Sequence, residues 1–157
     1  MSIKAVRAHL AAHGLEERIR TFEVSSATVD LAAQALGVIP ARIAKTLSFL
    51  TKEGCLIIVA AGDARIDNSK FKHLFGEKAK MLPHEMVEDL TGHPVGGVCP
   101  FAVKEGVRIY LDESMKRFDI VYPAAGTPQS AVEMTCEELA RASLALGWVD
   151  VCKDWQT

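Results

Sequence analysis

Hydrophobic and polar positions along the chain repeat with two different spacings. Apolar residues three and four apart, each run followed by a glycine, predict helices over 2–13 and 29–36. The segments 45–51 and 55–61 have the length and composition of strands. Because only a Lys-Glu-Gly turn separates them, these two segments are expected to pair as a β-hairpin.

The second half of the chain continues this mixture in shorter pieces. Asp67 and Pro83 are typical of helix starts and predict helices that run to about residues 75 and 90. Thr135 and Glu138 have the spacing of a capping box, which predicts a helix to about residue 146. Further strands are predicted at 20–24, 107–111, 118–121, 131–134 and 148–152. Since strands and helices do not alternate regularly, the predicted fold class is α+β.

Composition narrows the class of protein. The chain has 157 residues without repeats or a flexible linker, so a single domain over 1–157 is expected. Hydrophobic residues make up 49% and the formal net charge is -2, as in ordinary globular proteins of the cytoplasm. No apolar run approaches the roughly 20 residues that cross a bilayer, so no membrane association is expected. The slightly acidic charge argues against a protein that coats DNA or RNA through bulk electrostatics.

One short span of the chain is rich in basic residues. Arg65, Lys70, Lys72, Lys78 and Lys80 lie close together in sequence. Such a cluster is most often a solvated helix face, although a patch of this size can also hold a few phosphates.

Two candidate reactive groups can be weighed against simpler interpretations. His9 and His13 are four residues apart, as metal ligands on a helix can be, but no HExxH arrangement accompanies them. Surface histidines are favoured, and no metal or cofactor is predicted. Cys99 could be a nucleophile with His93 as its base. The absence of a basic neighbour and the presence of Pro100 directly after it disfavour that role, and the four widely spaced cysteines are expected to be free thiols.

The stretch GHPVGGVCPF at 92–101 has two adjacent glycines between two prolines. It matches neither GxxxxGK[ST] nor GxGxxG, so the usual phosphate-binding loops are not indicated. Such a loop exposes main-chain groups, of which carbonyls suit an ammonium and amides suit an oxyanion. Lys45 opens a largely apolar strand, and from the residues alone its amine either reaches the surface or points into a cleft.

Three segments together carry a resemblance to a known family. They are ARIAKTLSFL (41–50), VAAGDARIDNSKFKHLFG (59–76) and LTGHPVGGVCPF (90–101). In order and spacing they resemble the YbaK/prolyl-tRNA editing-domain family, over about residues 20 to 145. The resemblance implies a mixed, mostly antiparallel sheet flanked by helices. It also implies a free-standing trans-editing hydrolase, an aminoacyl-tRNA deacylase whose substrate is mischarged tRNA, most often tRNA-Pro carrying a small wrong amino acid, with prolyl-tRNA synthetase as a candidate partner.

The resemblance also assigns roles to residues. Lys45 matches the family's pocket lysine, near the terminal adenosine, and Gly96 and Gly97 with Pro100 match the loop whose main chain holds the aminoacyl end. Lys45, Gly96 and Gly97 are therefore the expected catalytic positions. The other implied substrate contacts are Val98, Cys99, Pro100, Phe22 and Thr46, and the implied tRNA phosphate contacts are Arg65, Lys70 and Lys72.

The amino acid that would be removed stays open. Cysteine-specific members of the family tend to carry an aspartate in a late strand, where this sequence has Ala131. A side chain at Gly96 or Gly97 is expected to fill the space for the aminoacyl group.

The expected reaction is attack by water, assisted by the ribose hydroxyl next to the ester, with no protein nucleophile. A non-catalytic module that binds tRNA acceptor ends or a synthetase is the alternative, and an esterase for small aminoacyl esters is a third.

Overall fold

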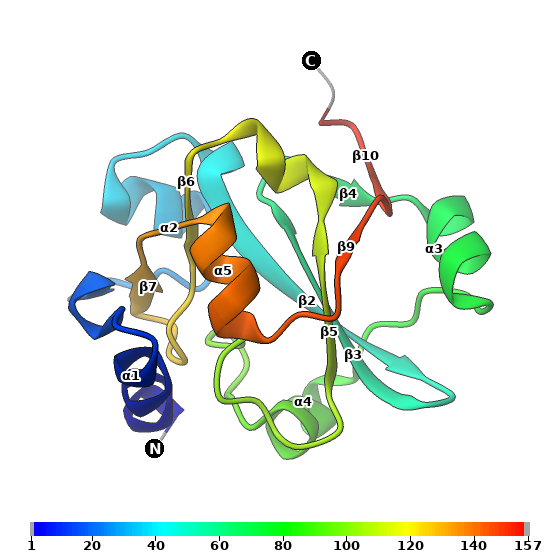
Figure 1. The fold of residues 1–157 in the computed structure, drawn as a ribbon, viewed down its shortest axis with the longest axis horizontal. Helices are drawn as coiled ribbons and strands as arrows, with labels where there is room; N and C mark the ends of the chain where they lie inside the picture. The colour runs from blue at the N-terminus through cyan, green and yellow to red at the C-terminus, as the bar shows by residue number, and fades with distance from the viewer. Residues whose placement is uncertain (1, 156–157) are drawn as a thin grey trace.

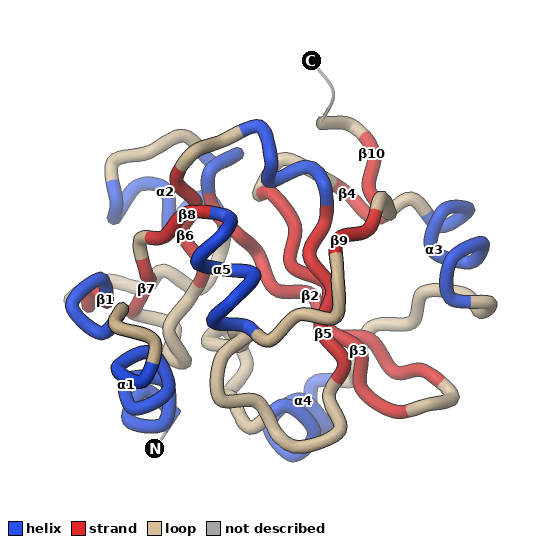
Figure 2. The backbone as a smooth tube through the Cα atoms, viewed as in Figure 1, coloured by secondary structure: helices blue, strands red, loops and turns tan. Residues whose placement is uncertain are grey.

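The computed structural model describes residues 2–155 and is built around a six-stranded sheet of order β8-β6-β2-β3-β5-β9 (Figures 1 and 2). The central hairpin joins β2 (Ile43–Thr51) to β3 (Gly54–Ala61). The other strands of this sheet are β5 (Arg108–Asp112), β6 (Ile120–Pro123), β8 (Met134–Thr135) and β9 (Trp148–Val149). Two small sheets pair β1 (Ile19–Thr21) with β7 (Ser130–Val132) and β4 (Arg65–Ile66) with β10 (Cys152–Lys153).

The helices surround this sheet. They are α1 (Ser2–Ala12), α2 (Val29–Leu36), α3 (Asn68–Phe75), α4 (His84–Thr91) and α5 (Cys136–Ser143). Three 3-10 turns, η1 (Glu16–Arg18), η2 (Pro40–Arg42) and η3 (Glu113–Arg117), precede β1 and β2 and follow β5. Helix α5 crosses in front of the sheet, while α1 and α3 lie at opposite sides of the molecule (Figure 1). None of these helices is long and apolar enough to span a bilayer.

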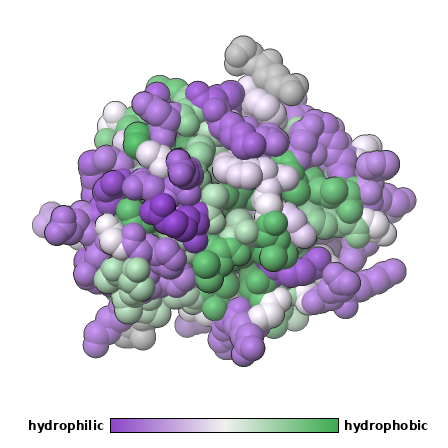
Figure 3. Space-filling view, in the orientation of Figure 1, coloured by the Kyte–Doolittle hydropathy of each residue, from purple (hydrophilic) through white to green (hydrophobic). Residues whose placement is uncertain are grey.

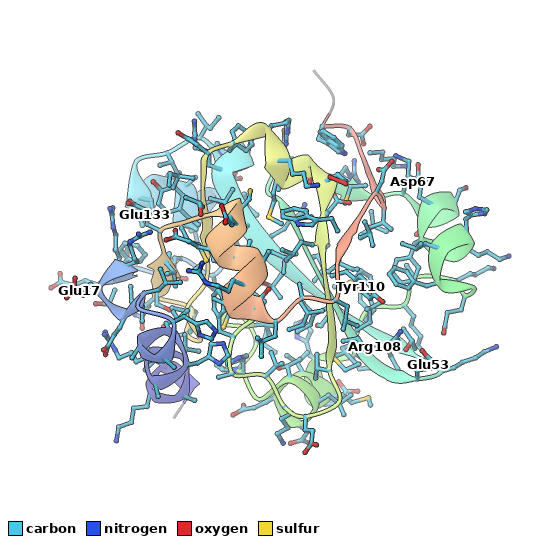
Figure 4. All side chains as sticks on the ribbon, viewed as in Figure 1. Glu17, Glu53, Asp67, Arg108, Tyr110 and Glu133 are labelled. Atoms are coloured by element: carbon cyan, nitrogen blue, oxygen red, sulfur yellow. The ribbon has the colours of Figure 1, made fainter. Side chains whose placement is uncertain are left out.

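The core forms around β3, which is buried from Cys55 to Ala61. A strand covered on both faces reads as a continuous apolar run, as this one does. On the side of α3, Phe49 and Phe71 pack with ring centroids 5.0 Å apart, and Phe71 and Phe75 with centroids 4.8 Å apart. At the outer end of the hairpin, Arg108 of β5 forms an ion pair of 3.1 Å with Glu53 (Figure 4).

The predicted fold class and the mixed sheet are confirmed. Four of the seven strand pairs within residues 2–155 are antiparallel, and helices flank the sheet. The capping box is also as predicted: the Thr135 hydroxyl accepts from the Glu138 amide, and the Glu138 carboxylate accepts from the Thr135 amide.

Two boundaries differ from the sequence prediction. The helix that begins after Thr135 ends at Ser143 because Leu144 adopts a left-handed conformation, with φ 57°. The predicted strand 148–152 is two short strands that belong to different sheets. The carboxylate of buried Asp112 accepts from the Val151 amide at 2.9 Å and so holds the chain between them.

Candidate functional site

The edge of β2 that faces away from β3 has a gap. Its first two residues pair with β6. Farther along, the main chain of 80–82 covers the edge, with hydrogen bonds of 2.8 Å to Leu50 and 3.0 Å to Ser48. Between these two partners, residues 45–47 have no neighbouring strand on this side in the part of the chain that the structure describes, and a cavity of about 340 Å³ lies there.

The cavity wall combines apolar and hydroxyl-bearing side chains. Five segments meet β2 there: residues 26–29 at the start of α2, the start of α4 with residues 81–82 before it, the loop around Gly96, the end of β6, and the start of β7. The serines and threonines of the wall are Ser26, Thr28, Thr46, Ser48 and Ser130. Within the described residues, no cysteine, aspartate or glutamate contributes to the wall, and its titratable residues are Lys45, His84 and Tyr122.

Lys45 lines this cavity, but its amine is engaged elsewhere. The half-buried amine donates hydrogen bonds to the carbonyls of Gly62 and Ala64, in the turn after β3. Burial lowers the pKa of the Lys45 amine, and the nearby Cys152 and Asp63 partly offset this effect. The Lys45 amine therefore bonds to the 62–64 turn and not to the glycine loop.

The two loop glycines have different surroundings. Gly96 has φ +87° and lines the cavity, and a Cβ there would come within 3.3 Å of the side chains of Ala27 and Pro128. A Cβ at Gly97 would lie 2.6 to 2.8 Å from main-chain atoms of Thr127. Close approach of another loop of the protein thus explains the glycine at 97, where the sequence suggested room for a ligand.

Cys99 lies behind the loop and outside the cavity wall. Its side chain is fully buried, and its sulfur is 3.6 Å from Nε2 of His93. Burial raises the pKa of the Cys99 thiol to about 12 and lowers the pKa of the His93 imidazole. A protonated thiol with no access to ligand is a packing group. Pro100 is buried too and does not line the cavity.

The remaining expected substrate contacts divide into two groups. Thr46 and Val98 line the cavity, and so does Ala131. Phe22 is outside the wall, beside the turn before β7, where its amide donates to the Gln129 carbonyl at 2.8 Å.

The expected phosphate contacts lie on or near α3, at one side of the molecule (Figure 1). Arg65 and Lys72 are exposed. The Lys70 amine donates to Asp150 at 2.9 Å and to the Cys152 carbonyl at 3.0 Å, so it is already paired.

Sequence patterns did not single out His84 and Tyr122, which come to the cavity from α4 and β6. The rings of His9 and His13 stack with centroids 5.0 Å apart, and one ring nitrogen of each contacts a carbonyl, that of Ala142 and that of His9 respectively. Within residues 2–155, no group of three or more metal-ligating side chains occurs. On the face shown in Figure 3, apolar side chains gather in front of the sheet among polar ones.

Comparisons with known proteins place these features in a wider set. A family model described as an aminoacyl-tRNA editing domain matches residues 23–142. An uncharacterised protein of Bacillus subtilis, YwhH, is 50% identical over 158 residues, which cover 99% of this chain and 100% of that protein. A proline–tRNA ligase of Kosmotoga olearia is 33% identical over 90 residues, which cover 57% of this chain and 16% of the ligase.

Solved structures agree with the sequence matches. One, described as a candidate trans-editing enzyme for prolyl tRNA synthetase, superposes with a TM-score of 0.87 at 29% identity and covers 97% of both chains. Another, a hypothetical protein, has a TM-score of 0.85 at 31% identity and covers 95% of this chain and 99% of its own.

Proposed function

The chain belongs to the aminoacyl-tRNA editing-domain family, and from this premise we propose that it is a deacylase that hydrolyses the ester of mischarged tRNA. The family supports a role in tRNA editing. The match to part of proline–tRNA ligases suggests tRNA-Pro as the tRNA. The cavity at the gap in β2 carries the proposal within the structure, because it joins Lys45 to the loop at Gly96 in one concave site.

The size and lining of the cavity suit a small aminoacyl group. At about 340 Å³ it is near the lower end of ligand pockets, which run from roughly 300 to 1,000 Å³. A second site that sorts by size is useful because one methylene changes binding by only about 1–3 kcal/mol. Ala131 of β7 lines the cavity with a methyl group only, which suits a small substrate side chain.

The proposed chemistry is attack by water on the ester carbonyl. The wall has no cysteine, and its serines and threonines have no carboxylate-oriented histidine beside them among the described residues. An aminoacyl ester is already reactive, and the neighbouring ribose hydroxyl can position the water. The protein then contributes orientation, which is worth several kcal/mol when reacting groups are held near attack distance.

Lys45 would act through its charge. Its amine is held by the two carbonyls of the 62–64 turn at the side of the cavity. A fixed positive charge there favours the developing oxyanion and the phosphates of the acceptor end. The loop residues Gly96 and Val98 would form the opposite wall.

Release of the amino acid tests this proposal. Substoichiometric protein is mixed with tRNA-Pro charged with alanine, serine, cysteine or proline, and free amino acid is followed over time. Multiple turnovers on at least one mischarged tRNA are expected. Tight binding without release would support a binding module instead. Equal rates on small aminoacyl esters, with no dependence on salt, would indicate an esterase, because phosphate contacts make binding salt-dependent.

A further inference from the structure

The main-chain hydrogen bonds of β2 alternate between its two edges. Thr51 and Gly54 face each other across the two-residue turn of the hairpin and so form a doubly hydrogen-bonded pair. The main-chain groups of successive residues in a strand point to opposite edges, so the Thr51 amide and carbonyl face β3 and those of Leu50 face away from it. The same alternation makes the amides and carbonyls of Ser48 and Thr46 point away from β3. The bonds that join 80–82 to Ser48 and Leu50 agree with this register.

Thr46 is the residue of this edge that falls in the gap. Within residues 2–155, no hydrogen bond satisfies its amide or its carbonyl, and its buried hydroxyl has no partner either. Thr46 also lines the cavity. Thr46 is half-buried, so its unpaired amide and carbonyl are available to a ligand that enters the cavity.

We propose that the aminoacyl group of the substrate pairs with Thr46 as a single residue of an antiparallel strand. The Thr46 amide donates to the ester carbonyl oxygen, and the Thr46 carbonyl accepts from the α-ammonium. This inference rests on the proposed function and names the groups by which the same site recognises its substrate.

The chemistry of an α-amino ester matches the gap. Its α-ammonium is a donor and its carbonyl is an acceptor, separated by one carbon as in a strand residue, which exchanges both bonds with its partner. The described wall has no carboxylate to hold an ammonium, and the unpaired Thr46 carbonyl at the open edge of β2 can accept from one. The amide is placed to meet the carbonyl oxygen where negative charge develops.

Main-chain pairing predicts which groups of the substrate the site recognises. It requires the α-amine and the carbonyl of the amino acid and places no demand on the side chain. Discrimination among amino acids then comes from the rest of the wall, such as Gly96 and Ala131.

The test compares two esters of the same tRNA-Pro. Alanyl-tRNA has the α-ammonium, and chemically acylated propionyl-tRNA has a hydrogen in its place. Each enzymatic rate is divided by the spontaneous hydrolysis rate of the same ester, because the ammonium itself activates the ester. The rate enhancement is expected to be at least about tenfold larger for alanyl-tRNA. Enhancements equal within about twofold would overturn the pairing while leaving the deacylase function intact. If neither ester is hydrolysed, the comparison is repeated with seryl- or cysteinyl-tRNA-Pro and the matching ester that lacks the ammonium, and no turnover of any of these would refute the proposed function.

Two variants at one position separate the main chain from the side chain. Thr46→Val keeps the amide and the carbonyl, so the ratio between the two esters should stay as in the unchanged protein even if both rates fall. Thr46→Pro removes the amide, which β3 does not use, and should lower the enhancement on both esters by at least about tenfold. The melting temperature of each variant shows whether it is folded. Full activity of a folded Thr46→Pro variant would contradict the role of the amide, and the ester comparison on the unchanged protein decides the matter if that variant does not fold.

Discussion

Substitution of Gly97 by alanine tests the contact between the glycine loop and the turn before β7. A Cβ at this position would lie 2.6 Å from Cα of Thr127, where an ordinary contact is 3.4 Å or more. The neighbouring atoms belong to the main chain and cannot rotate away. The two segments must therefore separate by roughly 0.8 Å, and overpacking of this kind costs about 1–3 kcal/mol.

The expected result is a loss of both stability and activity. For a chain of this size, about 1 kcal/mol lowers the melting temperature by about 2–4 °C, so Gly97→Ala should melt about 2–12 °C below the unchanged protein. Deacylation should also fall, because the displaced loop forms one wall of the cavity at Gly96 and Val98.

Gly147→Ala is the matched control. Among the described residues, no atom beyond its chain neighbours lies within 4 Å of the place that a Cβ at Gly147 would take, and its φ is not left-handed. Alanine there should be neutral or stabilise the fold by about 0.4–1 kcal/mol, by restricting the unfolded chain. Thermal melts followed by circular dichroism, with the deacylation assay on the same samples, give both readouts. If both variants melted at the same temperature, the close contact inferred at Gly97 would be wrong.

Three further predictions concern charge and protonation. Lys45→Ala should lower kcat/KM for deacylation by about 10- to 100-fold, and it should also destabilise the fold because the carbonyls of Gly62 and Ala64 lose their donor. Lys4→Ala is the control, and equal activity of the two variants would contradict the role of Lys45. Burial raises the pKa of all four cysteine thiols, so at pH 8 iodoacetamide should modify the folded protein much more slowly than the unfolded one. A thiol that is labelled rapidly in the folded protein would contradict this prediction. Burial lowers the pKa of the His93 imidazole below its ordinary value of 6.5, so the unfolded chain binds a proton there more readily and the stability of the fold should decrease as the pH drops below about 6.5. Between pH 7.5 and 5.5 the urea midpoint should decrease less in His93→Gln than in the unchanged protein, and an equal decrease would show that His93 does not cause the effect.

Local signals in the sequence determined much of this fold. The helix from Thr135 begins with a capping box whose two bonds join residues three apart, and the helix at 29–36 ends at a left-handed glycine. The β2–β3 hairpin has a two-residue turn between strands of matching pattern. Each of these elements depends on neighbours within a few residues, so its pattern is visible in the sequence. The adjacent glycines of the loop were visible too, whereas the resemblance of three segments to a known family, and not the local pattern, pointed to Lys45 as a pocket residue.

Tertiary structure decided what surrounds these elements. No local pattern shows that β6 pairs with only the first two residues of β2, or that a different segment, 80–82, pairs with this edge from Ser48 onward. The cavity exists because of the gap between these two partners. The partners of Lys45 and Gly97 come from 17 and 30 residues away, and the two halves of 148–152 join different sheets. Such contacts depend on strand register and on the packing of distant segments, which the order of residues encodes only through the whole fold.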